Sequence, residues 1–226
     1  MTGPPPAATL LAAEQAVNLG SRLLRQGRSH VGGLIGKGDR DFATAVDRQV
    51  EEAVKGSLGE VLPSIPFLGE EEGGPGIEEG LLWVLDPIDG TVNFMRGSPL
   101  CSISLALVED GEPRLAIVDL PLMGERYVAA QGAGAYLNGR RITASEVKRL
   151  HDAVVGFADF SVGPEAREEN RLHLEIIRRL AVESLRIPRS WFRRAGSRLA
   201  RGGPARRDAD AVEPALGRKR RRPAGA

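Results

Sequence analysis

The chain has 226 residues, 42% of them hydrophobic and 27% charged, and its formal net charge is +1. This composition excludes a disordered or collagen-like chain, and a single cysteine, Cys101, excludes an internal disulfide. The charge is unevenly divided, because residues 188–226 hold twelve basic and three acidic side chains, which leaves 19 basic and 27 acidic side chains in residues 1–187.

Two helices are expected in the first 60 residues. Residues 7–26 carry apolar side chains at helical spacing, and Gly27 follows as a stop signal. Residues 44–58 form the second helix, in which valines recur every fourth residue on one face. These are Val46, Val50 and Val54. The glycines of residues 32–38 predict a mobile or tightly turning segment between the helices.

Strands are expected in the middle of the chain. A short apolar run at 65–68 precedes a continuous one at 81–85, which is typical of a buried strand and is expected to stop at Asp86-Pro87. Further strands are predicted at residues 101–108, 114–120, 127–130, 135–137 and 154–158, with turns at 109–112 and 138–139. A long amphipathic helix is expected over 165–185. The mixture indicates an α/β (α+β) fold.

The segment from Trp83 to Phe94 has the strongest chemical signal. Asp86 and Asp89 follow a buried strand, Pro87 fixes the backbone between them, and Gly90 permits a tight turn. This arrangement directs both carboxylates and the carbonyl of Ile88 toward one point, and converging hard oxygen ligands suit Mg²⁺. Asp-Pro and Asp-Gly are also ordinary turn formers, so these two residues alone leave a structural role open.

More carboxylates lie upstream, at Glu70 and Glu71 after Gly69. Clustered acids repel one another unless a cation neutralises them. The order G-E-E, then D-P-I-D-G-T-V-N-F, resembles the inositol monophosphatase family of Mg²⁺-dependent phosphatases. Residues 41–47 (D-F-A-T-A-V-D) and 132–139 (G-A-G-A-Y-L-N-G) are similar to two further motifs of that family, so the resemblance extends from about residue 37 to 187. It implies a layered α/β/α/β/α sandwich, which forms a homodimer when the chain is complete.

The resemblance also implies a set of metal ligands. Glu70, Asp86 and the carbonyl of Ile88 would hold a first Mg²⁺, and Asp86 and Asp89 would share a second. Glu71 is left open between a supporting role and a solvated one.

Catalytic and substrate-binding roles follow from the same resemblance. Glu70 and Thr91 would orient and activate the attacking water, and Asp47 would hold the hydroxyl of Thr91. The phosphate would lie against Asp89 and the backbone amides of Gly90 and Thr91, at a helix N-terminus. Whether Lys37 approaches the phosphate stays open.

The implied reaction is hydrolysis of a small phosphate monoester, with inositol 1-phosphate favoured as substrate. Histidinol phosphate, fructose 1,6-bisphosphate and adenosine bisphosphate are alternatives within the same fold. Val92-Asn93-Phe94 follows Thr91 as in the inositol group, whereas the nucleotidase and histidinol types usually carry a lysine there.

The resemblance stops near residue 188, so residues 1–187 are taken as the N-terminal part of the domain and 188–226 as a separate, Arg-rich tail. The family's G-S-x-A, L-D and W-D segments are missing, and its W-D aspartate completes the second metal site. Reading the codons one base later from Pro188 permits G-S-G-A, L-D-L-A and P-W-D-V-S-A-G in family order, so we expect a frameshift there. The C-terminal half is then incomplete, with an exposed apolar face, poor solubility and little or no activity.

A second interpretation makes the tail an arm that binds nucleic acid. The tail has only Trp191 and Phe192 as aromatic residues and no periodic face, so nucleic acid is not the partner we expect. The first eleven residues do not resemble a secretory signal, and no apolar run is long enough to span a membrane. We therefore expect a cytoplasmic protein with no membrane partner.

Overall fold

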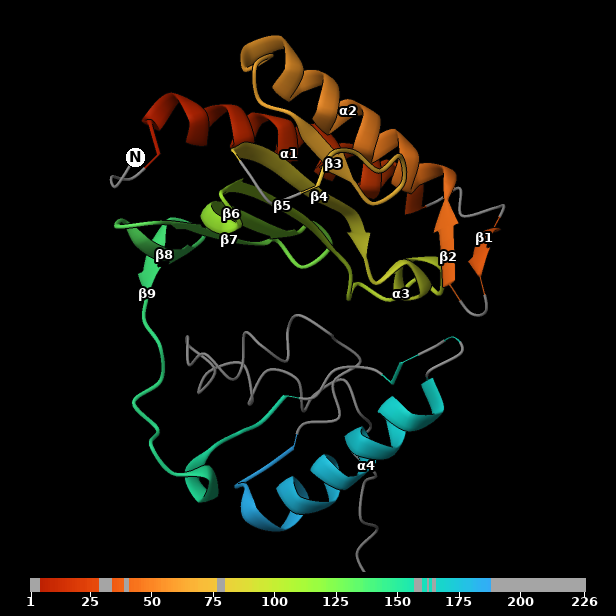
Figure 1. Cartoon of the computed structure of the whole chain (residues 1–226), viewed down its shortest axis with the longest axis vertical. Helices are drawn as coiled ribbons and strands as arrows, with labels where there is room; N and C mark the ends of the chain where they lie inside the picture. Colours follow the sequence, from red (N-terminus) through yellow and green to blue (C-terminus); the bar gives the residue numbers. More distant parts are fainter. Residues whose placement is uncertain are drawn as a thin grey trace, which may run out of the picture.

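Two long helices form one layer of the protein (Figure 1). The computed structural model describes residues 5–28, 34–38, 41–76, 80–156, 160–161, 163 and 166–187, and only the backbone of 34–38 and 41–44. Helix α1 spans Ala7–Gly27 and helix α2 spans Ala45–Val61, close to their predicted bounds. The two pack against each other, and Val46, Val50 and Val54 are all buried, which confirms the predicted apolar face of α2.

A seven-stranded sheet forms the second layer, with its strands in chain order from β3 to β9. The strands are β3 (Phe67–Gly69), β4 (Leu81–Asp89), β5 (Ser102–Glu109), β6 (Glu112–Leu120), β7 (Glu125–Ala130), β8 (Gly134–Leu137) and β9 (Arg140–Ile142). All neighbours are antiparallel except β3 and β4, which run parallel. The mixed α/β fold class is therefore as predicted.

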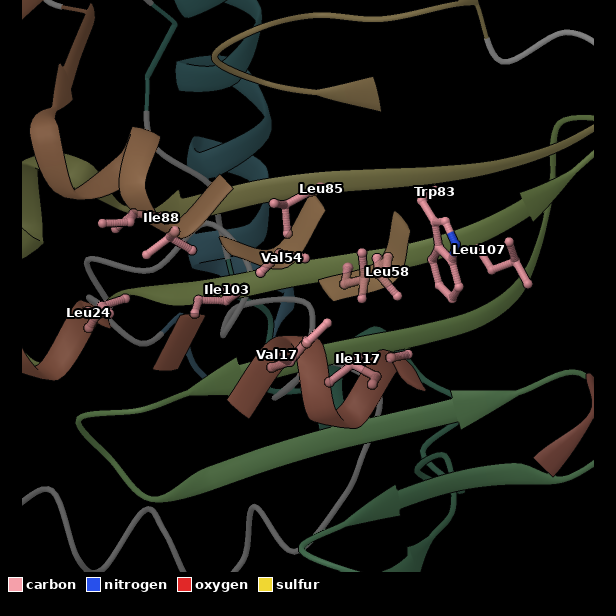
Figure 2. Packing of buried hydrophobic residues seen from close by; sticks show 14 of the residues in the cluster. Val17, Leu24, Val54, Leu58, Trp83, Leu85, Ile88, Ile103, Leu107 and Ile117 are labelled. Atoms are coloured by element: carbon pink, nitrogen blue, oxygen red, sulfur yellow. The ribbon is translucent and has the colours of Figure 1, made fainter. Parts of the chain in front are cut away.

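The hydrophobic core lies between the helices and the sheet (Figure 2). Every second residue of β4, β5 and β6 points toward the helices, so Trp83, Leu85, Ile103, Leu105 and Ile117 are buried. Val17 and Leu24 of α1 and Val54 and Leu58 of α2 meet them from the helical side. Complete burial of one such side chain is worth about 1.5–3 kcal/mol, so this interface anchors the strands that carry the acidic residues.

Two local predictions were wrong. Strand β4 continues to Asp89 instead of stopping at Asp86, because it keeps pairing with β5 past Pro87. Gly36 and Gly38 lie in strand β1 (Leu34–Gly38), which pairs with β2 (Asp41–Thr44), rather than in a turn. This small hairpin contacts α2 and the short helix α3 (Thr91–Met95).

The remaining described segment follows β9. It contains a short 3₁₀ helix, Leu150–Asp152, and helix α4, Ala166–Glu183. The predicted strand at 154–158 is reduced, within the described residues, to one parallel bridge between Val154 and Arg186; residues 157 and 158 lie outside them.

Figure 1 shows α4 on the opposite side of the sheet from α1 and α2. Its only buried residue is Ala166, and Leu172, Leu174 and Val182 are 61%, 56% and 82% exposed. These three side chains lie on different sides of the helix, so the exposed apolar face expected from an incomplete C-terminal half stays a prediction. A second large sheet is not found among the described residues, and no helix among them is both long and apolar enough to cross a bilayer.

Candidate active site

The end of β4 bends at Pro87. Asp86 pairs with Ser104 and Asp89 with Ser102, so β4 holds one more residue than β5 over this stretch. Proline has no N–H for the sheet, and an extra residue on one strand is the usual result. The bulge lets Asp86 and Asp89 follow each other closely at the strand end, and both side chains are partly accessible to solvent.

Gly90 turns the chain from β4 into α3. Its φ is +89°, and a Cβ atom there would lie 2.9 Å from the carbonyl oxygen of Leu100. Only glycine fits both the left-handed backbone and this close approach. The side chain of Asn93 donates a hydrogen bond to the same oxygen at 2.9 Å, which fixes the turn against the start of β5.

Thr91 connects this turn to α2. Its hydroxyl Oγ1 lies 3.0 Å from the carbonyl oxygen of Ile88 and 3.3 Å from Oδ1 of Asp47. Asp47 is only 2% exposed, in the first turn of α2. The family resemblance implied this contact, and it joins two segments that are 44 residues apart in the chain.

Glu70 lies at the neighbouring strand end. The parallel register pairs Gly69 of β3 with Leu85 of β4, so Glu70 and Asp86 are the next residues along two adjacent strands that run in the same direction. The side chain of Glu70 is exposed, in a turn that Gly69 and Gly73 close through two mutual backbone hydrogen bonds of 3.2 Å. The topology therefore brings Glu70 and Asp86 to one edge of the sheet.

The donor set fits Mg²⁺ in its chemistry, because Glu70, Asp86, Asp89 and the carbonyl of Ile88 supply only hard oxygens. Among the described residues, however, no three acidic, histidine or cysteine side chains converge in a way that could hold a metal ion. Asp86 and Asp89 are close in sequence and Glu70 lies at the end of the adjacent strand, but the three carboxylates are not gathered around a common centre.

Cys101 is fully buried beside this site, as expected for a small apolar residue. Burial raises the pKa of its thiol to about 12, Arg28 opposes that shift, and the charges of Asp89 and Asp47 add to it. The negative charges of Asp47 and Asp89 therefore both disfavour ionisation of the Cys101 thiol.

Arg28 was not predicted from the sequence. It donates a 2.6 Å hydrogen bond to the carbonyl of Gly97 after α3.

Glu51 is a second residue that sequence reasoning missed. It is fully buried on α2, and its carboxylate accepts hydrogen bonds from the backbone N–H groups of Glu71 and Glu72, both at 2.9 Å. The available signal was its spacing, four residues after Asp47 and three before Val54, which places an acid on the inward side of the helix. Glu71, which the sequence left open, contributes a backbone donor here.

The motif at residues 132–139 lies elsewhere, in strand β8 and the turns that join it to β7 and β9. Asn138 has a φ of +48°, accepts the N–H of Arg126 at 2.8 Å and donates to the carbonyl of Gly124 at 3.0 Å. That motif therefore builds the sheet rather than the site. The side chain of Lys37 and residues 188–226 lie outside the described part of the chain.

Comparison with known proteins gives the family. The model of the inositol monophosphatase family matches residues 7–197. A protein named Nus factor SuhB from Xylella fastidiosa is 37% identical over 164 residues, covering 73% of this chain and 56% of that protein. Inositol-1-monophosphatase ImpA from Mycolicibacterium smegmatis is 38% identical over 153 residues, covering 68% and 55%. Histidinol-phosphatase from Mycobacterium tuberculosis is 40% identical over 130 residues, covering 55% and 50%.

A solved structure agrees with these relatives. The extragenic suppressor protein SuhB from Bartonella henselae superposes with a TM-score of 0.73 at 28% identity, over 80% of this chain and 70% of that one. The chain spans about half the length of the curated relatives it matches. By its sequence, its fold and the order of its motifs, the chain belongs to the inositol monophosphatase family.

Proposed function

We propose that this protein is a Mg²⁺-dependent phosphomonoesterase whose substrate is inositol 1-phosphate. The observation that carries the proposal is the hydrogen bond between Thr91 and Asp47 beside the acidic end of β4. Membership of a phosphatase family supports the reaction class. The substrate rests on Val92-Asn93-Phe94 after Thr91, and the proposed homodimer on the same family resemblance.

Thr91 is proposed to orient the attacking water. A hydroxyl has one proton, and both neighbours of Oγ1, the carboxylate of Asp47 and the carbonyl of Ile88, can only accept it. Because its one proton is already donated to one of these oxygens, the hydroxyl of Thr91 can only accept a hydrogen bond from a further partner. A water molecule beside Thr91 would turn a proton toward it and a lone pair away, toward phosphorus.

Glu70 is proposed to take the second proton of that water, because its carboxylate lies on the same edge of the sheet and is open to solvent. Glu70, Asp86, Asp89 and the carbonyl of Ile88 are the residues that would hold Mg²⁺. When bound, the cation lowers the pKa of water and neutralises charge on the phosphoryl group. Asp89, Gly90 and Thr91 would border the phosphate.

The experiment has two arms. The first titrates the full chain with Mn²⁺, which has the same ligand preference and is visible by electron paramagnetic resonance. The Asp89→Asn variant should bind Mn²⁺ at least about tenfold more weakly, since it removes a ligand charge. Asp110→Asn, the same change in the exposed β5–β6 turn at a φ of +52° that suits asparagine, is the matched control.

The second arm measures phosphate release from inositol 1-phosphate, histidinol phosphate, fructose 1,6-bisphosphate and adenosine bisphosphate, with Mg²⁺ and with Li⁺ as competitor. It uses a chain in which residues 188–226 are replaced by the shifted reading of the frameshift hypothesis, because the chain as written lacks the family's W-D aspartate. Turnover of inositol 1-phosphate that Asp89→Asn abolishes supports the proposal. Undiminished turnover in Asp89→Asn contradicts the site.

A further inference from the structure

The fully buried carboxylate of Glu51 faces the turn that carries Glu70. Oε2 accepts the N–H of Glu71 and Oε1 accepts the N–H of Glu72, each at 2.9 Å. Both oxygens are thus bonded to consecutive backbone amides. Hydrogen bonds to an ionised group are about twice as strong as neutral ones, so Glu51 is a strong internal anchor for this turn.

The turn is shaped to admit that carboxylate. A Cβ atom on Gly69 would lie 2.0 Å from Oε1 of Glu51, and one on Gly74 would lie 2.4 Å from the carbonyl oxygen of Phe67. Both are closer than any real contact of that kind, so neither position accepts a side chain without movement. The turn wraps around Glu51 and closes through the mutual bonds of Gly69 and Gly73.

A second contact from α2 reaches the same turn at the surface. Lys55, one helical turn after Glu51, donates to Oε2 of Glu72 at 2.5 Å, and both side chains are about half exposed. The Glu72 carboxylate raises the pKa of Lys55. An exposed pair of this kind contributes little, so the buried carboxylate is the main tether.

Glu70 lies between the closed end of the turn at Gly69 and the clamped amide of Glu71, and its own side chain is exposed. Helix α2 therefore holds both parts of the site: Asp47 reaches Thr91, and Glu51, four residues later, reaches the turn. We propose that Glu51 is a positioning residue that fixes the Glu70 turn against the end of β4 for metal binding. This inference rests on the proposed function for the role of Glu70.

The test uses Glu51→Gln in the full chain. Glutamine keeps the size but puts an amide donor where an acceptor faces a backbone N–H. Glu52→Gln is the matched control, since it makes the same change at the next, exposed residue of α2. Val54→Ala is a second control, because Val54 is fully buried in the same helix and its truncation lowers stability without touching the turn.

Three quantities are measured: Mn²⁺ affinity, amide hydrogen exchange at residues 70–73, and melting temperature. We expect Glu51→Gln to weaken Mn²⁺ binding by about tenfold or more, as is usual when the support of a metal ligand is removed. The amides of Glu71 and Glu72 should also exchange at least about tenfold faster, because their acceptor is disturbed. Val54→Ala should lower only the melting temperature, and Glu52→Gln should change none of the three.

Wild-type Mn²⁺ affinity in Glu51→Gln, or equal losses in Val54→Ala, would overturn the inference. Failure of the wild-type chain to bind Mn²⁺ would instead count against the proposed function. The exchange measurement needs no metal, so it then decides alone whether Glu51 fixes the turn.

Discussion

The hydroxyl of Thr91 lies 3.3 Å from the buried carboxylate of Asp47 and so ties the start of α3 to the start of α2. Asp47 has almost no contact with solvent, whereas Thr91 is partly accessible. The hydrogen bond thus connects a buried residue of the helical layer with a residue that lies at the surface of the proposed site. Its strength can be measured without any turnover.

A double-mutant cycle of Asp47→Asn and Thr91→Val should show a coupling of about 0.5–3 kcal/mol in the free energy of unfolding, because the two side chains share one hydrogen bond. Urea titrations of the two single variants and the double variant give this value. Additive effects would mean that the contact contributes nothing to folding. Thr91→Ser, which keeps the hydroxyl, should retain most of the coupling.

Gly69→Ala should destabilise the protein by about 1–3 kcal/mol or more, the usual range for overpacking, because the new methyl group would meet the Glu51 carboxylate. Gly56→Ala is the control, because outside the helix's own backbone nothing lies within 4 Å of a Cβ at that position in α2. It should stabilise the helix by about 0.5–1 kcal/mol. Similar urea midpoints for the two variants would contradict the tight fit.

The thiol of Cys101 should resist alkylation at pH 8 in the folded protein and react readily in urea, because its pKa is raised from 9.0 to about 12 by burial. The unfolded thiol ionises above about pH 9 while the folded one keeps its proton. The contribution of Cys101 to the free energy of unfolding should therefore be fully present below pH 9 and be lost as pH rises toward 12. Cys101→Ala should lack this part of the decline. Equal alkylation rates in the folded and unfolded states would contradict the prediction.

Substitution of Val182 by lysine should change the free energy of unfolding by no more than about 0.5 kcal/mol, since this side chain is 82% exposed on α4. It should also reduce aggregation, measured by light scattering, because it removes an exposed apolar side chain. Val54→Lys, at a fully buried position, should unfold the protein. A large loss of stability in Val182→Lys would show that something covers this face.

The nucleotide sequence from codon 188 onward should permit the shifted reading, and codons 216–218 should supply its W-D segment. A chain expressed in that frame is expected to be soluble and to release phosphate, whereas the chain as written is expected to show little or no activity. If the codons do not permit the shifted string, the frameshift hypothesis is wrong. The tail would then be expected to bind polyanions in a salt-sensitive manner that is lost on removal of residues 188–226.

Local patterns predicted most of the elements. The spacing of Val46, Val50 and Val54 predicted α2, and the turn signals at residues 109–112 and 138–139 lie where β5 turns into β6 and β8 into β9. Strand β9 and the order of the strands in the sheet were not predicted. The predictions failed where pairing with another strand overrides the preference of glycine and proline for turns, as at Gly36 in β1 and at Pro87 within β4.

The candidate site could be assembled from the sequence only in part, for a similar reason. Asp86, Asp89 and Thr91 stand out because they are close in sequence, and Asp47 was found only through the family resemblance. The contact between Glu51 and the turn 20 residues away is visible only in the folded structure. Contacts between segments that are distant along the chain cannot be read from the local pattern of a single sequence.

The order of the layers also affects how this chain is made. Helices α1 and α2 precede every strand of the large sheet, so they leave the ribosome before the surface that covers Val17 and Val54 exists. Their apolar sides can be shielded at first only by each other, as they are in the folded protein. The sheet can then grow one hairpin at a time, since β4 to β9 are neighbours in sequence as well as in space. If synthesis pauses between residues 61 and 103, the chain is in its most aggregation-prone form, because the pair of helices has no sheet to cover its apolar side.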